Sequence, residues 1–340
     1  MTANLQNPIF TDETKAREWL EARVWPNGPV CPHCGSTGED VTALQGKAHR
    51  SGLYQCAGCR EQFTVTVKTV FERSKIPLSK WLAALFLLTA SKKGVSAHQV
   101  HRSLGISYKS SWFMMHRLRE AMRTGGLLPD MGGSGQVVEA DETYFGMIPK
   151  DEIMPRAIGH GKKKVGKRAG IRRPAYRAVF ALVERGGKAR TFHIAQADQN
   201  TVHAIMKANV TKETRVHTDE SGIYNIAPWH FEKHETVKHS AKEYVRYTNE
   251  FSFPDGKRNI VTTNTVEGYF SIFKRGMKGV YQHCDEKHLH RYLAEFDFRY
   301  NTRTALGFND LMRAEALAEG IKGKRLTYRR PHKITQPSAD

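Results

Sequence analysis

The sequence predicts an α/β fold for the larger, C-terminal part of this 340-residue chain, preceded by a small cysteine-rich module and a helical region. Beyond Gln136, runs rich in β-branched residues alternate with helical patterns, which favours an α/β domain. Four of the five cysteines fall in two CxxC pairs before residue 60, and apolar residues recur at helical spacing between the two regions. We therefore expect four segments: 1–68, an N-terminal helix and the cysteine module; 69–130, a helical region; 136–310, the α/β domain; and 311–340, a basic tail.

Composition and charge limit the classes of protein to which the chain can belong. Lys and Arg number 53 against 34 Asp and Glu, a formal net charge of +19, and 39% of the residues are apolar. That apolar content is enough for globular cores, so a wholly disordered chain is excluded. The large positive charge favours a polyanionic partner, of which nucleic acid is the commonest.

No segment of the sequence resembles a membrane span or a secretion signal. The longest apolar run, Trp81–Ala90, is too short to cross a bilayer, and the N-terminus is polar and carries acidic residues. We therefore expect no membrane partner and a cytoplasmic protein.

The spacing of four cysteines predicts a structural metal site. Cys31 and Cys34 form one CxxC pair, and Cys56 and Cys59 form a second pair after 21 intervening residues. Each pair directs two thiolates at one point, and two pairs complete a tetrahedral shell of four sulfurs, which suits Zn²⁺. Because protein fills all four positions, the ion would be structural and the module a zinc ribbon. Unrelated free thiols are the alternative.

Three helices are predicted between the ribbon and Gln136. They are Leu78–Ala90 with Ser79 as its N-cap, a second helix from Ser96 to Leu104, and a third from Tyr108 to Arg123. Gly105 suits the turn after the second helix because glycine readily adopts a left-handed conformation. The second and third helices have the lengths and the turn of a helix-turn-helix.

The third helix carries candidate DNA-binding residues. Its apolar residues follow one stripe, which we expect to be buried: Met114, Met115, Leu118, Ala121 and Met122. Four basic residues remain to read a groove or to neutralise phosphates: Lys109, His116, Arg119 and Arg123. An ordinary helical hairpin with a solvated charged face is the alternative.

The α/β domain is predicted from an alternating order of strands and helices. The predicted strands are Gln136–Asp141, Ala175–Val183, Thr191–Ala195 and Arg215–Asp219. The predicted helices are Asn200–Ala208, Thr265–Gly279 and His288–Arg303. The basic segment Met147–Pro174 is predicted to be a loop, because it holds nine Lys or Arg and only two acids.

Three acidic residues are candidates for a metal centre. Asp141 and Asp219 end predicted strands, where acids are disfavoured unless they meet solvent or a cation, and Glu267 lies on a predicted helix. Mg²⁺ takes carboxylate ligands, and two ions about 4 Å apart activate the attacking oxygen and stabilise the leaving oxygen in phosphoryl transfer. Glu139 shares the strand face of Asp141 and is a spare candidate ligand. For each acid alone, a surface or capping role is the alternative.

Basic residues follow Glu267 on the same predicted helix. Lys274 lies seven residues, or two turns, after Glu267 and therefore on the same face, and Lys278 extends that face. A lysine beside a catalytic carboxylate can hold a DNA phosphate in register with the metals. A solvated lysine on an amphipathic helix is the alternative.

The sequence resembles a known group, the DDE transposases of bacterial insertion sequences. Within them it is similar to the zinc-ribbon-bearing ISXO-type family, which is related to eukaryotic Merlin elements. The resemblance is carried by segments that span nearly the whole chain in the family's order: REWLEARVWPNGPVCPHCG, YQCAGCREQFTVTVKTVFE, VVEADETYFG, VHTDESGIY, ETVKHSAKEYVR and NTVEGYFSIFKRGMKG.

The resemblance implies an RNase-H-like, retroviral-integrase-like catalytic core with a mixed sheet that cuts and joins DNA ends using two Mg²⁺ or Mn²⁺ ions. It places the acidic triad on Asp141, Asp219 and Glu267, with Lys274 as the basic partner. Asn264 is an alternative third ligand, since some family members carry Asn or His where others carry Glu. His239 and Tyr244 also match family positions.

The resulting hypothesis is a DNA transposase that binds the terminal inverted repeats, hydrolyses the phosphodiester at the transposon end and joins the 3′-hydroxyl to target DNA. Pairing two ends requires at least two active sites, so we expect a homodimer or a higher oligomer on DNA. A non-catalytic DNA-binding regulator, or an inactive domesticated transposase, is the first alternative. A non-catalytic regulator would explain the positive charge and the four paired cysteines but not the three candidate carboxylates. A metal-dependent nuclease that does not join strands is the second.

Overall fold

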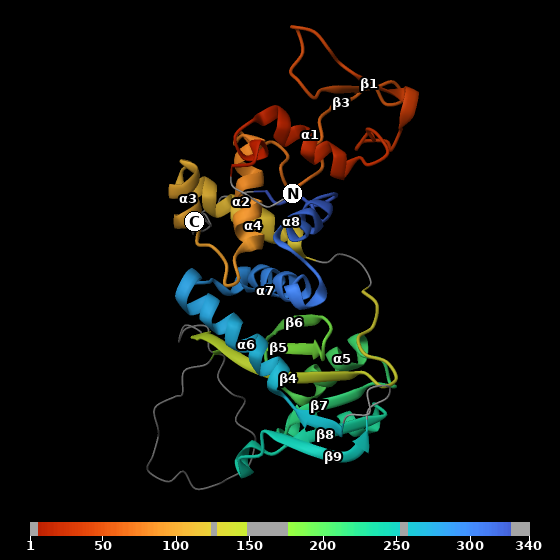
Figure 1. Ribbon diagram of the computed structural model, residues 1–340, viewed down its shortest axis with the longest axis vertical. Coiled ribbons are helices and arrows are strands. Elements are labelled where there is room, and N and C mark those ends of the chain that lie inside the picture. The colour runs from red at the N-terminus through yellow and green to blue at the C-terminus, as the bar shows by residue number, and fades with distance from the viewer. Residues whose placement is uncertain (1–5, 124–127, 148–175, 252–257, 328–340) are drawn as a thin grey trace, which may run out of the picture. The chain divides into compact units, whose positions relative to one another are not determined.

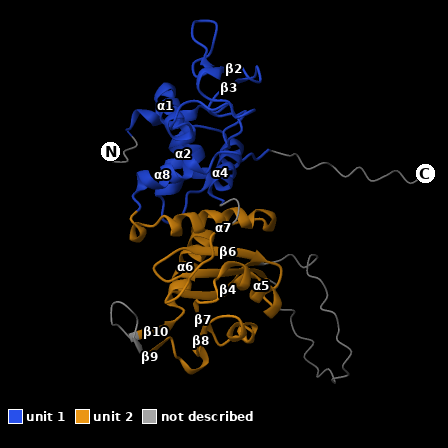
Figure 2. Ribbon diagram, turned by 90° about the vertical axis from the view of Figure 1, so that its right-hand side faces the viewer, with its two compact units in different colours: residues 1–124, 308–340 blue, residues 125–307 orange. Residues whose placement is uncertain are grey.

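The computed structural model describes residues 6–123, 128–147, 176–251 and 258–327. The chain divides into two compact units, which Figure 2 shows in different colours. One unit holds residues 1–124 and 308–340, and the other holds residues 125–307. Apart from its first residue, the basic loop predicted over Met147–Pro174 lies outside the described residues.

The described residues of the first unit form a three-stranded antiparallel sheet and five α-helices. The strands, in the order β1-β2-β3, are Val41–Ala43, Tyr54–Cys56 and Gln62–Phe63. The helices are α1 (Glu13–Val24), α2 (Leu78–Ala90), α3 (Ala97–Leu104), α4 (Tyr108–Met122) and α8 (Asp310–Glu319). Two short 3₁₀ turns, Pro8–Phe10 and Gly38–Asp40, complete this unit. Helix α2 is buried along most of its length and packs against α1 and α8.

The predicted cap of α2 is wrong. Ser79 is the second residue of the helix, and Pro77, at the N-cap position, offers no side-chain hydrogen bond. The carboxylate of Glu13, which lies on α1, caps α2 instead. It accepts hydrogen bonds from the backbone N–H of Leu78 at 2.7 Å and of Ser79 at 3.0 Å. A carboxylate satisfies the exposed N–H groups of a helix start and is favoured there by the helix dipole.

Helices α3 and α4 form the predicted helical pair. Ser96 caps α3 by accepting a hydrogen bond from Gln99 N at 3.1 Å, and Gly105 ends the helix with a φ of 58°. Ser107 then caps α4 in the same way. The predicted apolar stripe of α4 is buried, as expected.

The C-terminal segment differs from the predicted tail. Instead of a tail from residue 311, helix α8 covers Asp310–Glu319, and Ala314, Leu317 and Ile321 are buried in the first unit. Asn309 caps this helix through Met312 N. The apolar residues sit three or four apart along α8, which is the spacing of one buried helical face. Only residues 328–340 of the predicted tail lie outside the described residues.

The second unit is built on a five-stranded mixed sheet, as the predicted α/β class requires (Figure 1). Its order is β6-β5-β4-β7-β8. Pairs β4–β5 and β5–β6 are antiparallel, whereas β4–β7 and β7–β8 are parallel. The strands are β4 (Val137–Met147), β5 (Tyr176–Glu184), β6 (Ala189–Ile194), β7 (Arg215–Asp219) and β8 (Lys233–Val237).

The helices of this unit are α5 (Gln199–Asn209), α6 (Asn264–Gly276), which continues into a π-helical turn at Met277–Tyr281, and α7 (Glu286–Asn301). A separate hairpin pairs β9 (Val245–Phe251) with β10 (Arg258–Thr262). Short 3₁₀ turns lie at Gly222–Tyr224, Ala227–Trp229, His239–Ala241 and Thr304–Leu306. Strands β8, β9 and β10 were not predicted.

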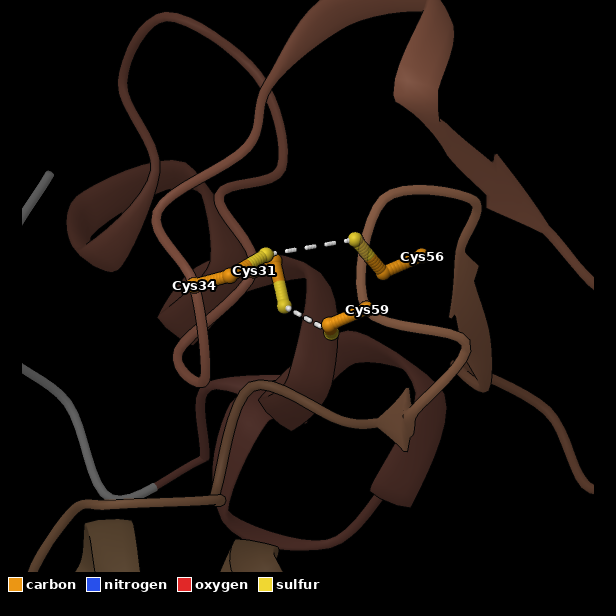
Figure 3. Close-up of side chains that lie close together, drawn as sticks. All are labelled: Cys31, Cys34, Cys56 and Cys59. Carbon is orange, nitrogen blue, oxygen red and sulfur yellow. Dashed lines mark hydrogen bonds between the residues drawn. The ribbon is translucent and has the colours of Figure 1, made fainter.

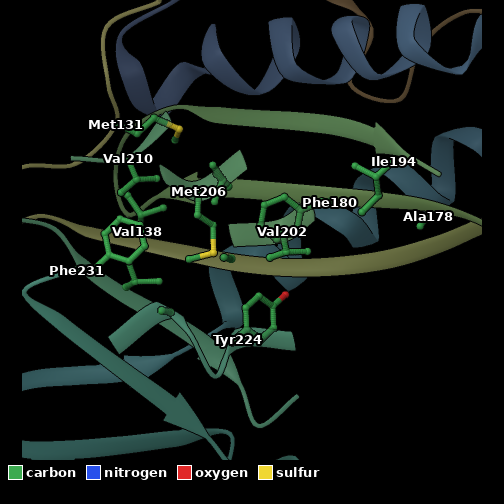
Figure 4. Packing of buried hydrophobic residues seen from close by; sticks show 14 residues of the cluster. Met131, Val138, Ala178, Phe180, Ile194, Val202, Met206, Val210, Tyr224 and Phe231 are labelled. Atoms are coloured by element: carbon green, nitrogen blue, oxygen red, sulfur yellow. The ribbon is translucent and has the colours of Figure 1, made fainter. Parts of the chain in front are cut away.

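Two hydrophobic layers cover the two faces of the sheet. One layer joins Val138, Ala140 and Phe180 of the sheet to Val202 and Met206 of α5 (Figure 4). The other joins alternate residues of β5 to α6 and α7: Val179, Ala181, Val183, Val266, Phe270, Phe273, Leu289, Leu293 and Phe296. Because successive residues of a strand point to opposite faces, Glu139 and Asp141 lie on the α6 and α7 face.

Asp297, a half-buried acid, connects the elements of that second layer and is expected to make the stability depend on pH. The carboxylate of Asp297 on α7 accepts hydrogen bonds from Thr191 N and Oγ1 at 2.9 Å and from the Tyr269 hydroxyl at 2.7 Å. Burial raises the pKa of Asp297 to about 6. The folded chain therefore holds this proton more tightly than the unfolded chain, whose Asp has a pKa of about 3.9. The stabilisation is present below about pH 4 and is lost as the pH rises to about 6.

Asp297→Asn should remove this pH dependence, because an amide stays neutral. Relative to wild type, the free energy of unfolding of the variant should rise by about 2–3 kcal/mol between pH 4 and pH 7. Urea unfolding followed by circular dichroism across this range measures the difference. A constant difference between the two proteins would contradict the assignment.

Candidate active site and zinc site

The four paired cysteines come together in the first unit as predicted (Figure 3). Their sulfurs all lie within 4.8 Å of one another, with 3.6 Å between Cys31 and Cys59 and 3.5 Å between Cys34 and Cys56. Sulfurs at the corners of a tetrahedron around Zn²⁺ are about 3.8 Å apart for Zn–S distances of about 2.3 Å. The donor set and its spacing therefore fit a structural zinc ion.

The surroundings of the cysteines support metal binding. Hydrogen bonds from the side chain and backbone of Ser36 lower the pKa of the Cys34 thiol to about 6. Although a backbone hydrogen bond at Glu61 opposes the shift, burial and hydrogen bonds with the other three thiols raise the pKa of Cys59 to about 12. The four thiols therefore titrate as one group, in which Cys34 is the first to supply the thiolate that binds zinc. The apolar cluster around the site is small, with Cys31, Cys56 and Phe63 as its buried members. Such a cluster is too small to hold the module together without a further link.

The sheet brings Asp141 and Asp219 together. In the parallel pairing of β4 with β7, Val138 faces Val216 and Glu139 faces His217. Two residues further along each strand stand Asp141 and Asp219. Because side chains alternate, both carboxylates leave the sheet on the face covered by α6.

The pKa of Asp141 reflects its burial and the other carboxylates around it. Burial, followed by the charges of Glu142, Asp219 and Glu267, raises the pKa of Asp141 to about 7. A hydrogen bond at 2.8 Å from its neighbour's backbone N–H offsets only part of this effect. The three predicted carboxylates thus act on one another, although among the described residues only the cysteines form a group as tight as a single-ion site.

Glu267 reaches the site from the first turn of α6. Its Oε1 accepts a hydrogen bond from Thr263 Oγ1 at 2.8 Å and lies 3.6 Å from His239 Nε2. The His239 ring lies 5.3 Å from that of Tyr244, measured between centroids. The structure therefore places His239 beside Glu267 and Tyr244 beside His239. Asn264, the alternative ligand, is exposed at the first position of α6.

A cleft of about 720 Å³ opens beside Asp141 and Glu267, whereas Asp219, His239 and Tyr244 are not among the residues that line it. Asp141 and Glu267 line it together with Lys274 and Lys278, which follow on the same face of α6 and its π-helical extension. The predicted alignment of the two lysines with Glu267 is therefore present. Arg275, which the sequence did not single out, also lines the cleft.

The glutamates that follow the two aspartates have contacts of their own. Glu142 accepts a hydrogen bond at 2.6 Å from the hydroxyl of Tyr224, which is buried on the opposite face of the sheet. Glu220 accepts hydrogen bonds from Ser240 N and Oγ at 3.0 and 2.9 Å, and thereby anchors the turn that carries His239. Successive side chains along a strand point to opposite faces, so a glutamate directly after each aspartate is expected to have different contacts from that aspartate.

Two of the four DNA-binding candidates on α4 are wrong. His116 and Arg119 are 1% and 2% exposed, so they offer no surface to DNA. Arg119 follows Met115 by four residues and therefore lies on the buried stripe. Lys109 is exposed, and Arg123 is exposed and pairs with Glu120 at 2.7 Å.

Comparison with known proteins agrees with this architecture. Residues 133–301 match a family model described as the ISXO2-like transposase domain, and residues 11–62 match one described as the transposase zinc-ribbon domain. A protein in the transposable element ISH50 of Halobacterium salinarum is 25% identical over 295 residues, covering 85% of this chain and 91% of that protein. Within the described residues, no helix is both long and apolar enough to cross a membrane. The chain belongs to the zinc-ribbon-bearing, ISXO-type family of DDE transposases encoded by insertion sequences.

Proposed function

We propose that this transposase cuts the phosphodiester at the transposon end and joins the released 3′-hydroxyl to target DNA, at a site formed by Asp141, Asp219 and Glu267. The observation that carries the proposal is the meeting of acidic side chains from β4, β7 and α6, where burial and then the charges of Glu142, Asp219 and Glu267 raise the pKa of Asp141 to about 7. Folding gathers negative charge at one edge of the sheet, and a bound cation would offset the cost of doing so.

The donor set fits divalent metal ions. Oxygen ligands from a few carboxylates suit Mg²⁺ or Mn²⁺, and the three side chains, which do not form a group as tight as a single-ion site, would hold two ions rather than one. When bound, such ions polarise the phosphate and lower the pKa of an attacking hydroxyl or water. Asp141, Asp219 and Glu267 would hold them.

The remaining residues of the cleft would position DNA. Lys274 and Lys278 stand along the wall that continues from Glu267, where their charges can hold successive phosphates. In-line displacement by water and then by the 3′-hydroxyl requires no covalent protein–DNA intermediate, so no serine or tyrosine nucleophile is assigned. His239 and Tyr244 would contact the phosphate or orient Glu267.

The fold of each unit supports separate roles, catalysis in one unit and binding of the transposon end in the other. The mixed order β6-β5-β4-β7-β8 fits the RNase-H-like core that the family resemblance implies. In the other unit, α3 and α4 would act as a helix-turn-helix that, with the zinc ribbon, binds the terminal inverted repeats through exposed residues such as Lys109 and Arg123. Pairing of two ends would assemble a dimer or a higher oligomer.

A cleavage and strand-transfer assay tests the proposal. The substrates are DNA duplexes carrying the sequences that flank the gene, uncut or pre-cut at the end, with Mg²⁺ or Mn²⁺. We expect cleavage of the uncut end and joining of both substrates to target DNA. DNA binding without chemistry under both metals would favour the regulator or an inactive relic, and cleavage without joining of the pre-cut end would favour a nuclease.

The identity of the third ligand gives a separate prediction. Glu267 acts on Asp141 and offers a carboxylate, the better ligand for Mg²⁺, whereas Asn264 offers only a neutral amide oxygen. Glu267→Gln should therefore reduce joining of a pre-cut end by about 10²-fold or more, comparable to the loss of one electrostatic group in an active site. Asn264→Ala should retain activity within about threefold. The reverse order in single-turnover assays would identify Asn264 as the ligand.

A further inference from the structure

One buried carboxylate on the strand of Asp141 is fully engaged by contacts inside the protein. The side chain of Glu139 is 0% exposed. Its Oε1 accepts hydrogen bonds from Arg185 Nη2 at 2.7 Å and from Thr265 Oγ1 at 2.8 Å. Its Oε2 accepts from the backbone N–H groups of Thr265 at 2.7 Å and Val266 at 3.1 Å. Arg185 Nε also donates to Oε1, so this oxygen has three donors and Oε2 has two, and Glu139 is poorly placed to serve as the spare metal ligand that its strand face suggested.

These contacts fix the start of helix α6. Thr263, at the N-cap position, makes no side-chain capping bond to the helix backbone. Glu139 instead satisfies two N–H groups of the first turn from across the domain, and a carboxylate is favoured there by the helix dipole. Glu267 is the residue directly after Val266, so its distance from the two aspartates depends on this bond.

Arg185 completes the connection. It follows the last residue of β5, and its fork donates to Glu139 through Nε at 3.2 Å as well as through Nη2. Its Nη1 donates to the carbonyl of Ile260 at 2.8 Å, on the strand that leads into α6. One Glu–Arg pair therefore joins β4, which carries Asp141, to β10 and to α6, which carries Glu267.

We propose that Glu139 and Arg185 are positioning residues that set the separation of Glu267 from Asp141 and Asp219 and thereby the affinity of the site for divalent metal ions. This inference rests on the metal site proposed above. A buried ion pair adds little net stability compared with apolar residues of similar volume, because desolvating its charges is costly. Residues that orient metal ligands, by contrast, change metal affinity by about 10- to 100-fold when they are removed.

The test is direct binding of Mn²⁺ to the full-length, zinc-loaded protein, measured by electron paramagnetic resonance of the free ion. Glu139→Gln and Arg185→Gln should each raise the Kd for Mn²⁺ by about 10- to 100-fold. The double variant should be no weaker than the weaker single variant, because the two residues act as one unit. Half-saturating Mg²⁺ for strand joining should rise in parallel, with the rate recovering at saturating metal.

A matched control comes from a second fully buried glutamate that pairs with an arginine. Glu295 on α7 is also 0% exposed and pairs with Arg299. Glu295→Gln should lower the Tm but leave the Kd for Mn²⁺ within about twofold of wild type. If Glu139→Gln does not fold, Arg185→Lys keeps the charge while losing the planar fork, and it should also raise the Kd.

The outcomes separate this inference from the proposed function. A normal Kd in Glu139→Gln, together with loss of binding in Asp219→Asn, would overturn the positioning role and leave the metal site standing. Weak binding in Glu139→Gln with a normal Kd in Arg185→Gln would make Glu139 a ligand and also overturn it. If wild type binds no Mn²⁺, or Asp219→Asn binds it as well as wild type does, the metal site itself fails and the inference fails with it.

Discussion

Asp219→Asn is expected to reduce both strand cleavage and strand joining by about 10³-fold or more, which corresponds to about 4 kcal/mol of lost transition-state stabilisation. Asp219 ends β7, where its Oδ1 accepts a hydrogen bond from Ser221 N at 3.0 Å. Asparagine keeps the shape of the side chain and an oxygen for that bond, so the local turn should be retained. The variant loses the negative charge that would hold a divalent ion, which affects both displacement steps.

The measurement is single-turnover cleavage of an uncut end and joining of a pre-cut end at saturating protein. Asp141→Asn should cause a loss of similar size in both reactions. Asp198→Asn is the matched control, because Asp198 caps α5 through Thr201 N at 3.0 Å and asparagine caps a helix equally well. Joining by Asp219→Asn at a rate near that of wild type would exclude this carboxylate from the reaction.

Much of the site could be predicted from the sequence because its parts follow local rules. The strand Arg215–Asp219 was predicted with its observed bounds, since a short run of buried and β-branched residues ends there in an acid. Lys274 and Lys278 follow from helical spacing after Glu267, and the cysteine cluster from the two CxxC pairs. In each case the distance along the chain determines the distance in space.

The parts that were missed depend on contacts between distant segments. Thr265 lies 126 residues after Glu139, and no local pattern indicates that this glutamate caps α6 rather than facing the cleft. Glu13 caps α2 in the same long-range way. The burial of Arg119 is different, because its spacing from Met115 already placed it on the apolar stripe. There, burial on the apolar stripe outweighs the preference of a charged side chain for solvent.

Removing the zinc ion is expected to unfold the ribbon while the second unit keeps its fold. The strands β1, β2 and β3 contain only three, three and two residues, and the buried apolar cluster around them is small. Structural zinc contributes on the order of 10 kcal/mol of folding free energy in small modules, which is more than such a cluster can replace. Cys56, 0% exposed, is the most informative position because serine there removes a thiolate from the centre of the module.

Cys56→Ser should therefore lose its zinc and the amide hydrogen-exchange protection of residues 31–63, and it should bind terminal-repeat DNA at least about tenfold more weakly. Cys284→Ser is the matched control, since Cys284 is also buried but lies in the other unit beside α7. It should keep one zinc per chain and normal DNA affinity. Retention of zinc by Cys56→Ser would show that the other cysteines suffice. Loss of zinc with unchanged DNA binding would separate the ribbon from recognition of the transposon end and leave that task to α3 and α4.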